Sequence, residues 1–291
     1  ERKLIMIASE SISPRAVKQA MATGLGHLYA EGYPSTRMCA ASLPRLGELS
    51  EFLSYYRRYG SRRYYKGVEY ADFVEALARR RAAELFATDR AAADAIHVNV
   101  QSLSGAAANN AVYEAFLEPG DSVMGMDLTH GGHLTHGHEV NRSGRHYAIT
   151  HYRVGADGRL DYEAMKKLAA QVRPKLVIAG FSAYPWDIDW RRMREVADAA
   201  GPEPAVLLAD IAHTAGLISA GLAGSPVGYA DAVSMTTHKT LCGPRGAIIL
   251  STDRALADRI DTAVFPGEQG GPHVHQIAAK AVSFQIALTQ C

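Results

Sequence analysis

The chain has 291 residues, 47% of them hydrophobic, and a formal net charge of +1, which suits one large globular domain or a domain with an appendage. A net charge this small gives no reason to expect binding to nucleic acid or to a membrane surface. No apolar run approaches the roughly 18 residues that a membrane-spanning helix needs. The three cysteines are widely spaced, which argues against a disulfide framework and favours a cytoplasmic protein.

Residues 1–90 differ in pattern from the rest of the chain. Ser13 and Pro14 are typical of the N-cap and first turn of a helix, which we expect over 13–26. Apolar residues three and four apart predict a long helix over 68–86, and an arm rich in Tyr and Arg lies between the two. We therefore separate an N-terminal region, 1–90, from a large domain over 91–291.

After residue 90, strand-like apolar runs alternate with helical patterns. This order predicts a mostly parallel, mixed sheet with helices on both faces, an α/β protein of three α/β/α layers. Ligands bind such sheets beyond the carboxyl ends of the strands. The expected strands cover 95–100, 122–126, 146–154, 175–180, 205–210, 231–235 and 246–251, and the expected helices start near 105 and cover 161–172 and 190–201.

Two predicted strands end next to charged side chains. The strand AVLLAD ends in Asp210, and a later strand leads into TTHK, with Lys239. A carboxylate in apolar surroundings is costly without a cationic partner, although Asp210 taken alone could equally cap a helix. A lysine that forms a Schiff base, paired with an aspartate that keeps the pyridine nitrogen protonated, indicates this cofactor.

A third strand is followed by Ser104 and Gly105, where an Ala-rich helix begins. Free amides at a helix start attract phosphate, and glycine lets the phosphate approach the backbone closely. Taken alone, this pattern is more often a plain serine N-cap.

Four histidines crowd the loop DLTHGGHLTHGH, residues 127–138. Their spacing matches neither an HExxH helix nor a Cys/His finger, so we expect no metal site and give a metal-dependent hydrolase little weight. A neutral histidine ring stacked on a flat aromatic ring is the better interpretation. The four histidines are His130, His133, His136 and His138.

Taken together, segments across nearly the whole chain resemble serine hydroxymethyltransferases, a family of fold-type I pyridoxal phosphate enzymes. The resemblance implies pyridoxal 5'-phosphate as cofactor, an amino-acid substrate and a homodimer with shared active sites. It also implies a small C-terminal domain, carrying the arginine for the substrate carboxylate, beyond residue 291. The matching segments are IASESISP, YAEGYP, RRYYKGVEY, SGAAAN, GMDLTHGGHLTHG, AGFSAYPWDIDW, ADIAHTAGL, TTHKTLCGPRG and FPGEQGGP.

The resemblance implies roles around the cofactor. Lys239 would carry it covalently, and Asp210 would pair with its ring nitrogen. His133 would stack on the ring, and His213 would lie near the 3-hydroxyl. The pocket would be completed by Ser104, Gly105, Ala106, Ser182, Thr236, His238 and, from the other subunit, Gly271.

The resemblance also implies roles around the substrate. Glu31 would be the acid/base near the substrate hydroxyl, a residue that would otherwise be interpreted as a solvated loop carboxylate. Tyr65 would support the amino-acid carboxylate and hydroxyl, and Tyr64 would face the folate. The implied substrate residues are Ser9, Tyr29 from the partner subunit, Glu31, Tyr64, Tyr65 and Arg245.

Three departures from the family pattern matter. An insertion at about residues 36–61 interrupts the arm that shapes the substrate mouth, and so long a loop is usually functional. Ala106 replaces a usual serine, which removes a phosphate hydrogen bond of about 1–2 kcal/mol. Pro185 and Trp186 stand where small residues are usual.

These parts imply retro-aldol cleavage of a β-hydroxy amino acid through a glycine quinonoid, with Glu31 handling the hydroxyl proton. With tetrahydrofolate as acceptor, the enzyme is a serine/glycine hydroxymethyltransferase, which we favour because Glu31, Tyr64 and Tyr65 are intact. With an aldehyde acceptor, it is an L-threonine transaldolase or an enzyme for α-substituted serines. A non-catalytic relative would be expected to lack Lys239 or Asp210, and neither is lost.

Overall fold

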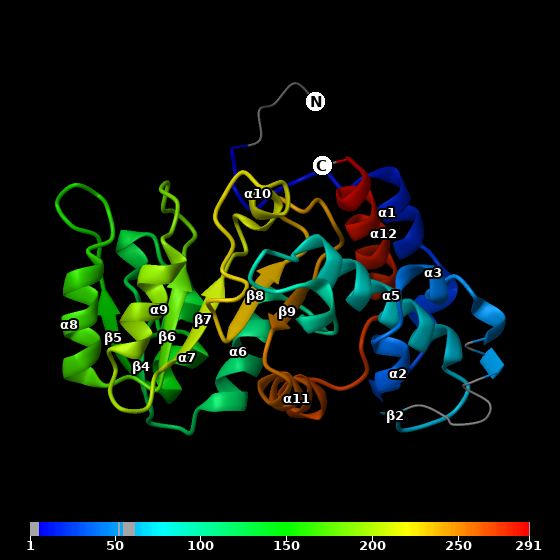
Figure 1. Cartoon of the computed structure of the whole chain (residues 1–291), viewed down its shortest axis with the longest axis horizontal. Helices are drawn as coiled ribbons and strands as arrows, with labels where there is room; N and C mark the ends of the chain where they lie inside the picture. Colours follow the sequence, from blue (N-terminus) through cyan, green and yellow to red (C-terminus); the bar gives the residue numbers. More distant parts are fainter. Residues whose placement is uncertain (1–5, 52, 55–61, 291) are drawn as a thin grey trace.

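A mixed seven-stranded sheet runs through the molecule in the order β3-β9-β8-β7-β6-β4-β5 (Figure 1). The computed structural model describes residues 6–51, 53–54 and 62–290. All neighbours from β8 to β5 pair in parallel, and β9 pairs antiparallel with both β8 and β3. The strands are β3 (His97–Asn99), β4 (Ser122–Met126), β5 (Ala148–Tyr152), β6 (Leu176–Gly180), β7 (Val206–Asp210), β8 (Ala232–Thr236) and β9 (Ala247–Ser251).

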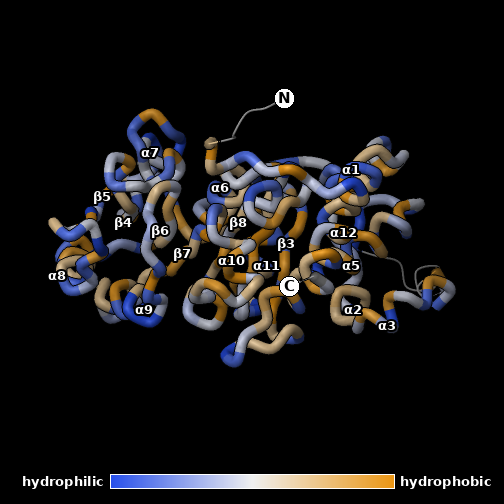
Figure 2. Tube along the Cα trace, turned by 90° about the horizontal axis from the view of Figure 1, so that it is seen from above, coloured by the Kyte–Doolittle hydropathy of each residue, from blue (hydrophilic) through white to orange (hydrophobic). Residues whose placement is uncertain are grey.

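Alternate side chains of the strands are buried in two separate cores. In β7, Leu208 packs into the core that contains residues of α6 and α11, whereas Leu207 and Ala209 pack into the core shared with α8 and α9. Figure 2 shows β7 between α6 on one side and α9 on the other. The predicted three-layer arrangement is therefore confirmed. The helices named here are α6 (Gly105–Phe116), α8 (Tyr162–Val172), α9 (Trp190–Asp198) and α11 (Arg254–Thr262).

The predicted N-terminal helix is shorter than expected and is capped differently. Helix α1 covers Arg15–Met21, and Pro14 rather than Ser13 occupies its N-cap position. The Ser13 hydroxyl instead donates to the carbonyl of Gly243, 2.9 Å away. The prediction of Ser13 as the cap was wrong, because the backbone of Pro14 is still non-helical, with ψ 154°, and the helix begins one residue later.

Three helices from opposite ends of the chain pack together at one end of the molecule (Figure 1). Helix α12 (Val274–Gln290) lies against both α1 and α5 (Glu69–Leu85).

Of the helices that the structure describes, none combines the length and apolar character needed to span a bilayer. The boundary near residue 90 stays a prediction. The remaining elements are η1 (Gly24–His27), η2 (Ala93–Ala95), η3 (Leu128–His130), η4 (Leu134–His136), α7 (Arg142–His146), α10 (Ala215–Ser219) and η5 (Ala263–Glu268).

The insertion leaves and rejoins the arm at a short antiparallel ladder. Strand β1 (Gly32–Tyr33) pairs with β2 (Arg62–Arg63), so both ends of the insertion lie side by side. Its described part forms α2 (Thr36–Cys39) and α3 (Leu43–Leu46), and residues 52 and 55–61 lie outside the described residues. Met38 and Leu46 pack against Ala76 of α5 in a small core of their own.

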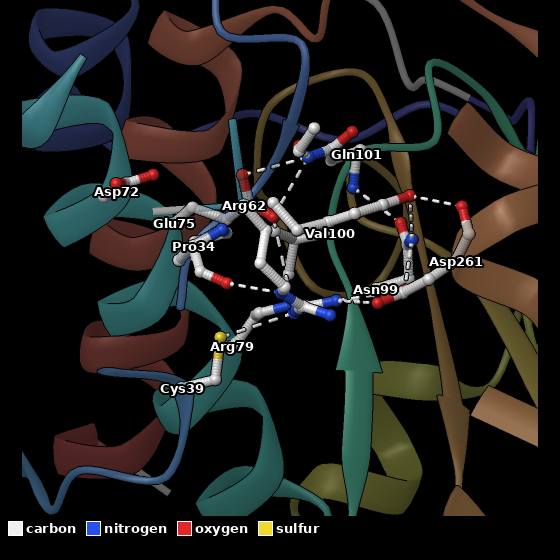
Figure 3. Close-up of polar contacts among 12 residues, drawn as sticks. Pro34, Cys39, Arg62, Asp72, Glu75, Arg79, Asn99, Val100, Gln101 and Asp261 are labelled. Carbon is white, nitrogen blue, oxygen red and sulfur yellow. Dashed lines mark hydrogen bonds and ion pairs between the residues drawn. The ribbon is translucent and has the colours of Figure 1, made fainter. Parts of the chain in front are cut away.

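A polar network fixes this region to the sheet (Figure 3). Arg79 of α5 donates to both carboxylate oxygens of Asp261, at 3.0 and 2.9 Å, and to the sulfur of Cys39, at 3.4 Å. Asn99, at the end of β3, donates to the same Asp261 carboxylate at 2.7 Å. The inserted helix α2, the long helix α5 and the sheet are thereby held in one arrangement.

Candidate active site

Asp210 and Lys239 lie at the same edge of the sheet. Asp210 ends β7, which pairs in parallel with β8 and places Asp210 opposite Ser234. Strand β8 ends at Thr236, and Lys239 follows in the next turn with 9% of its surface exposed. Because the two strands are parallel neighbours, their carboxyl ends bring the carboxylate and the amine to one place.

The Asp210 carboxylate is held by three donors. Its Oδ2 accepts hydrogen bonds from Asn109 Nδ2 at 2.8 Å and from His136 Nε2 at 3.0 Å, and its Oδ1 accepts from the amide of Ala212 at 3.1 Å. Burial alone would raise the pKa of Asp210, but His136, Asn109 and the Ala212 amide together hold that pKa well below its ordinary value. Asp210 is therefore ionised at neutral pH.

Asp210 is not a helix cap. The next helix, α10, begins at Ala215, and Thr214 occupies its N-cap position. The alternative interpretation of Asp210 as an N-cap is thus excluded by the distance along the chain. A largely buried carboxylate kept ionised in this way is suited to pair with a cation that enters the site.

Asn109 and His136 are themselves fixed by further hydrogen bonds. Asn109 Nδ2 also donates to Thr135 Oγ1 at 2.9 Å, and Asn109 Oδ1 accepts from Ser234 Oγ at 2.7 Å. His136 Nδ1 accepts from the amide of His133 at 3.3 Å, which leaves Nε2 as the nitrogen that donates to Asp210. The carboxylate is therefore oriented by Asn109 and His136 in one defined arrangement.

Asn109 and His136 were not among the predicted site residues. Two signals pointed to them: Asn109 lies four residues after Gly105, on the same face of the helix that starts at the predicted phosphate turn, and His136 lies three residues after His133. Neither signal shows which carboxylate these side chains reach.

The buried position of the Lys239 amine favours its neutral form. Burial lowers the pKa of Lys239, and the nearby Asp210 charge only partly opposes this. Its Nζ lies 3.1 Å from His213 Nε2, and burial together with the Lys239 charge lowers the pKa of His213. A neutral amine is the form that attacks an aldehyde.

The predicted phosphate turn lies against the end of β8. Helix α6 begins at Gly105, and Ser104 caps it by accepting a hydrogen bond from the Ala107 amide at 3.2 Å. A Cβ added at Gly105 would lie only 2.8 Å from Thr236 Cγ2, so glycine permits the close contact between the turn and β8. The first amides of a helix have no partner within it, so those of Gly105 and Ala106 are suited to an anion.

His133 lies beside this centre. Its Nδ1 is 2.8 Å from Thr135 Oγ1, and its ring centroid is 5.6 Å from that of His136. Burial, and then the neighbouring His136, lower the pKa of His133. A neutral ring of this kind can stack on a flat heterocycle.

The other predicted pocket residues lie at the end of β8 and in adjoining loops. The Ser182 amide donates to the Gly131 carbonyl at 2.8 Å, and Thr236 Oγ1 donates to the Ala212 carbonyl at 3.3 Å. The His238 carbonyl accepts from Ser11 Oγ at 2.6 Å, which ties the N-terminal segment to the Lys239 turn. Two predicted substrate residues, Ser9 and Arg245, are exposed.

A second group of predicted residues forms a cluster around Glu31. Tyr65 donates to Glu31 Oε2 at 2.8 Å. The Tyr29 ring lies against Gly271, where an added Cβ would be 3.0 Å from two ring carbons. Among the described residues, no hydrogen bond or ion pair joins Glu31, Tyr29 or Tyr65 to Lys239 or Asp210.

Tyr64 borders the same cluster. Its amide donates to the Glu31 carbonyl at 3.0 Å, and its ring meets Phe265 edge to face, with centroids 5.1 Å apart. The Tyr64 side chain is largely exposed. The resemblance implied that Tyr29 and Gly271 come from the other subunit, and the structure places both beside Glu31 and Tyr65 of the same chain.

The residues at the strand edge fit pyridoxal 5'-phosphate. An ionised, buried carboxylate and an amine share one edge, and a helix start too tight for a Cβ lies beside them. In addition, His238 Nδ1 is buried with no hydrogen-bond partner among the described residues. These are the parts that a charged pyridine, an aldehyde and a phosphate require.

The sheet and this residue set define a fold-type I pyridoxal phosphate enzyme. A family model described as Serine hydroxymethyltransferase matches residues 47–291. The chain belongs to the serine hydroxymethyltransferase family. It is therefore a pyridoxal phosphate-dependent transferase of the hydroxymethyltransferase type that binds an amino-acid substrate.

Proposed function

We propose that the enzyme cleaves the Cα–Cβ bond of serine and transfers the one-carbon unit to tetrahydrofolate. The observation that carries the proposal is the 2.8 Å hydrogen bond from Tyr65 to Glu31. It holds one carboxylate oxygen in place, and among the described residues no hydrogen bond occupies the other oxygen, which would accept the proton of a substrate hydroxyl. A residue in that role is what cleavage of a β-hydroxy amino acid requires.

The strand-edge residues supply the other half of the chemistry. Bound pyridoxal phosphate acts as an electron sink that weakens bonds at the amino-acid Cα. Lys239 would hold the cofactor through its amine, and Asp210 would keep a proton on the ring nitrogen. His133 would cover the ring, and Ser104 and Gly105 would bind the phosphate.

We propose in addition that the enzyme is a homodimer whose site combines the Lys239 centre of one chain with the Glu31 cluster of the other. Support comes from the grouping of Tyr29, Tyr65 and Gly271 around Glu31, apart from the Lys239 contacts. The residues that act on the substrate hydroxyl would then reach the cofactor from the partner.

An L-threonine transaldolase, or an enzyme for α-substituted serines, is the second candidate. The insertion favours it, because the insertion is rooted at β1 and β2, directly beside Glu31 and Tyr64. Trp186 is a second change from the family pattern. Its half-exposed ring lies under the Arg159 guanidinium, with 3.8 Å between Arg159 Cζ and the ring centroid. Either change can reshape the acceptor site while leaving the shared cleavage chemistry in place.

Product identification separates the two candidates. The purified enzyme is given serine with tetrahydrofolate and, separately, threonine with an aromatic aldehyde, and the products are identified by mass spectrometry. Glycine and a one-carbon folate in the first mixture support the proposal. A new aromatic β-hydroxy amino acid in the second mixture, with no folate product in the first, overturns it. Lys239→Ala is the control, since it should remove both activities.

A further inference from the structure

Lys280 places a buried ammonium against the turn that leads to the phosphate site. The residue lies in α12 and is 2% exposed. Its Nζ donates to three backbone carbonyls, those of Val100 at 2.7 Å, Ala247 at 2.9 Å and Ser102 at 3.3 Å. An ammonium has three N–H donors and no acceptor, so each of its protons has one carbonyl to bind.

No carboxylate forms an ion pair with Lys280 in the described part of the chain. Burial lowers the pKa of Lys280 to about 7, and the charge of Glu75 opposes that shift. A buried cation with only neutral partners is expensive for a fold to keep. A methionine would fill the same space without that penalty but could not donate to the three carbonyls, so the amine calls for a role in holding them.

The three carbonyls show what Lys280 holds. Val100 and Ser102 belong to the connection from β3 to α6, four and two residues ahead of Ser104. Ala247 starts β9, and its amide also donates to the Ser102 carbonyl at 3.0 Å. The Ser102 carbonyl therefore accepts hydrogen bonds from both the Lys280 amine and the Ala247 amide. These two bonds fix the position at which the turn enters α6.

Gly246 leaves room for this contact. A Cβ added there would lie 2.7 Å from Lys280 Cε and 2.9 Å from Lys280 Nζ. The sequence thus provides both the amine and the space into which it reaches, between the two strands that border the turn.

We propose that Lys280 is a positioning residue that shapes the β3–α6 turn for the cofactor phosphate. The proposal rests on phosphate binding at Ser104 and Gly105. It does not depend on the acceptor of the reaction, so its test needs no turnover.

The test compares pyridoxal 5'-phosphate with pyridoxal, which lacks the phosphate. The apo form of the full chain is titrated with each ligand by absorbance, for the wild type, Lys280→Met and the matched exposed-lysine control Lys175→Met. We expect Lys280→Met to weaken the binding of pyridoxal 5'-phosphate by at least about tenfold. Pyridoxal binding should change less than about twofold, and Lys175→Met should change neither.

Two binding results would overturn the proposal. One is an equal loss for both ligands, which would show that Lys280 supports the fold in general rather than the phosphate turn. The other is unchanged affinity for pyridoxal 5'-phosphate. If Lys280→Met does not fold, the same two affinities are measured for Lys280→Gln, which keeps two N–H donors, and the same outcomes apply. Failure of both variants to fold would assign the amine to stability and also overturn the proposal.

Discussion

The candidate site sets opposite requirements for two buried ionisable residues. Asp210 has to stay charged, and it does so because Asn109, His136 and the Ala212 amide donate to its oxygens. Lys239 has to be available without its proton, and burial favours that form. One edge of the sheet meets both requirements because the donors reach the carboxylate while the amine lies beside a histidine.

The lowered pKa of Lys239 predicts an unusually reactive amine. An ammonium has no lone pair, so the reaction with formaldehyde and cyanoborohydride follows the neutral fraction and rises with pH through the pKa. In the apo chain, the midpoint of methylation at Lys239 should fall at lower pH than that at the exposed Lys18. Mass spectrometry of peptides across pH 6–11 measures both in one sample. Equal midpoints would show that the site does not activate the amine.

Asn109 should control the ionisation of Asp210. Asn109→Ala removes one of the two side-chain donors, and we expect the free energy of unfolding to fall by about 1–3 kcal/mol. The depressed pKa of Asp210 contributes stability above the ordinary aspartate pKa of about 3.9, and that stability is lost as pH falls. The variant should bring the folded-state pKa closer to that ordinary value, so it should lose less stability than the wild type as the pH falls below about 4, and the loss should end at a higher pH. Urea unfolding from pH 3 to 7 tests this, and superimposable profiles would contradict it.

At the scale of elements, the β1–β2 ladder carries the Glu31 cluster. Arg63 of β2 donates through Nη1 to the carbonyls of Ala30 and Gly32, at 2.7 and 2.5 Å, on either side of Glu31. Its other nitrogens reach Asp72 and Glu75 of α5, each at 2.7 Å. One guanidinium therefore fixes the Glu31 backbone to a long helix.

Removing Arg63 should destabilise both the fold and the cluster. Arg63→Met leaves the buried Asp72 and Glu75 without this cation, and we expect a loss of about 3–5 kcal/mol in the free energy of unfolding. Arg63→Lys keeps the charge but not the planar fork, so its loss should be smaller. Denaturant unfolding of both variants measures this. A loss below about 1 kcal/mol for Arg63→Met would mean that the helix and ladder hold together without it.

The insertion should set the acceptor rather than the cofactor. Because Tyr33 pairs with Arg62, deleting residues 36–61 leaves chain ends that a short turn can join. We expect the KM for the acceptor to change by at least about tenfold and the affinity for pyridoxal 5'-phosphate by less than about threefold. Steady-state kinetics and absorbance titration measure the two quantities.

A packing variant controls for simple loss of stability. Leu46→Ala disturbs the packing of α3 on α5 and should lower stability by about 2–5 kcal/mol, while leaving the acceptor KM unchanged. If the deletion and Leu46→Ala have the same effect on acceptor kinetics, the insertion acts only through packing.

At the scale of the whole molecule, the two residue clusters predict complementation between chains. Lys239→Ala and Glu31→Gln should each be inactive alone. In a mixed dimer with shared sites, one site receives both defects and the other receives none. After unfolding and refolding an equal mixture, we expect about a quarter of the wild-type activity, because half of the dimers are mixed. No recovery would place each complete site within one chain.

Local sequence patterns determined the architecture of this protein. Strand and helix periodicities depend on near neighbours, so every predicted strand of the sheet was confirmed, with bounds within a few residues. The positions of Asp210 and Lys239 at one edge followed as well, because parallel strands end on the same side. Ser13 shows the limit of such patterns. The local sequence predicted that it caps a helix, but its hydroxyl donates to a carbonyl 230 positions away.

Tertiary structure alone decided which side chains surround those positions. Asn109 and His136 reach Asp210 from α6 and from the histidine loop, Lys280 reaches the phosphate turn from the last helix, and Gly271 meets Tyr29 across most of the chain. Such contacts depend on how distant elements pack, and periodicity carries no information about that. The sequence by itself therefore determined the sheet and the pair of Asp210 and Lys239 at its edge. Packing determined which groups surround this pair and set its charge and orientation.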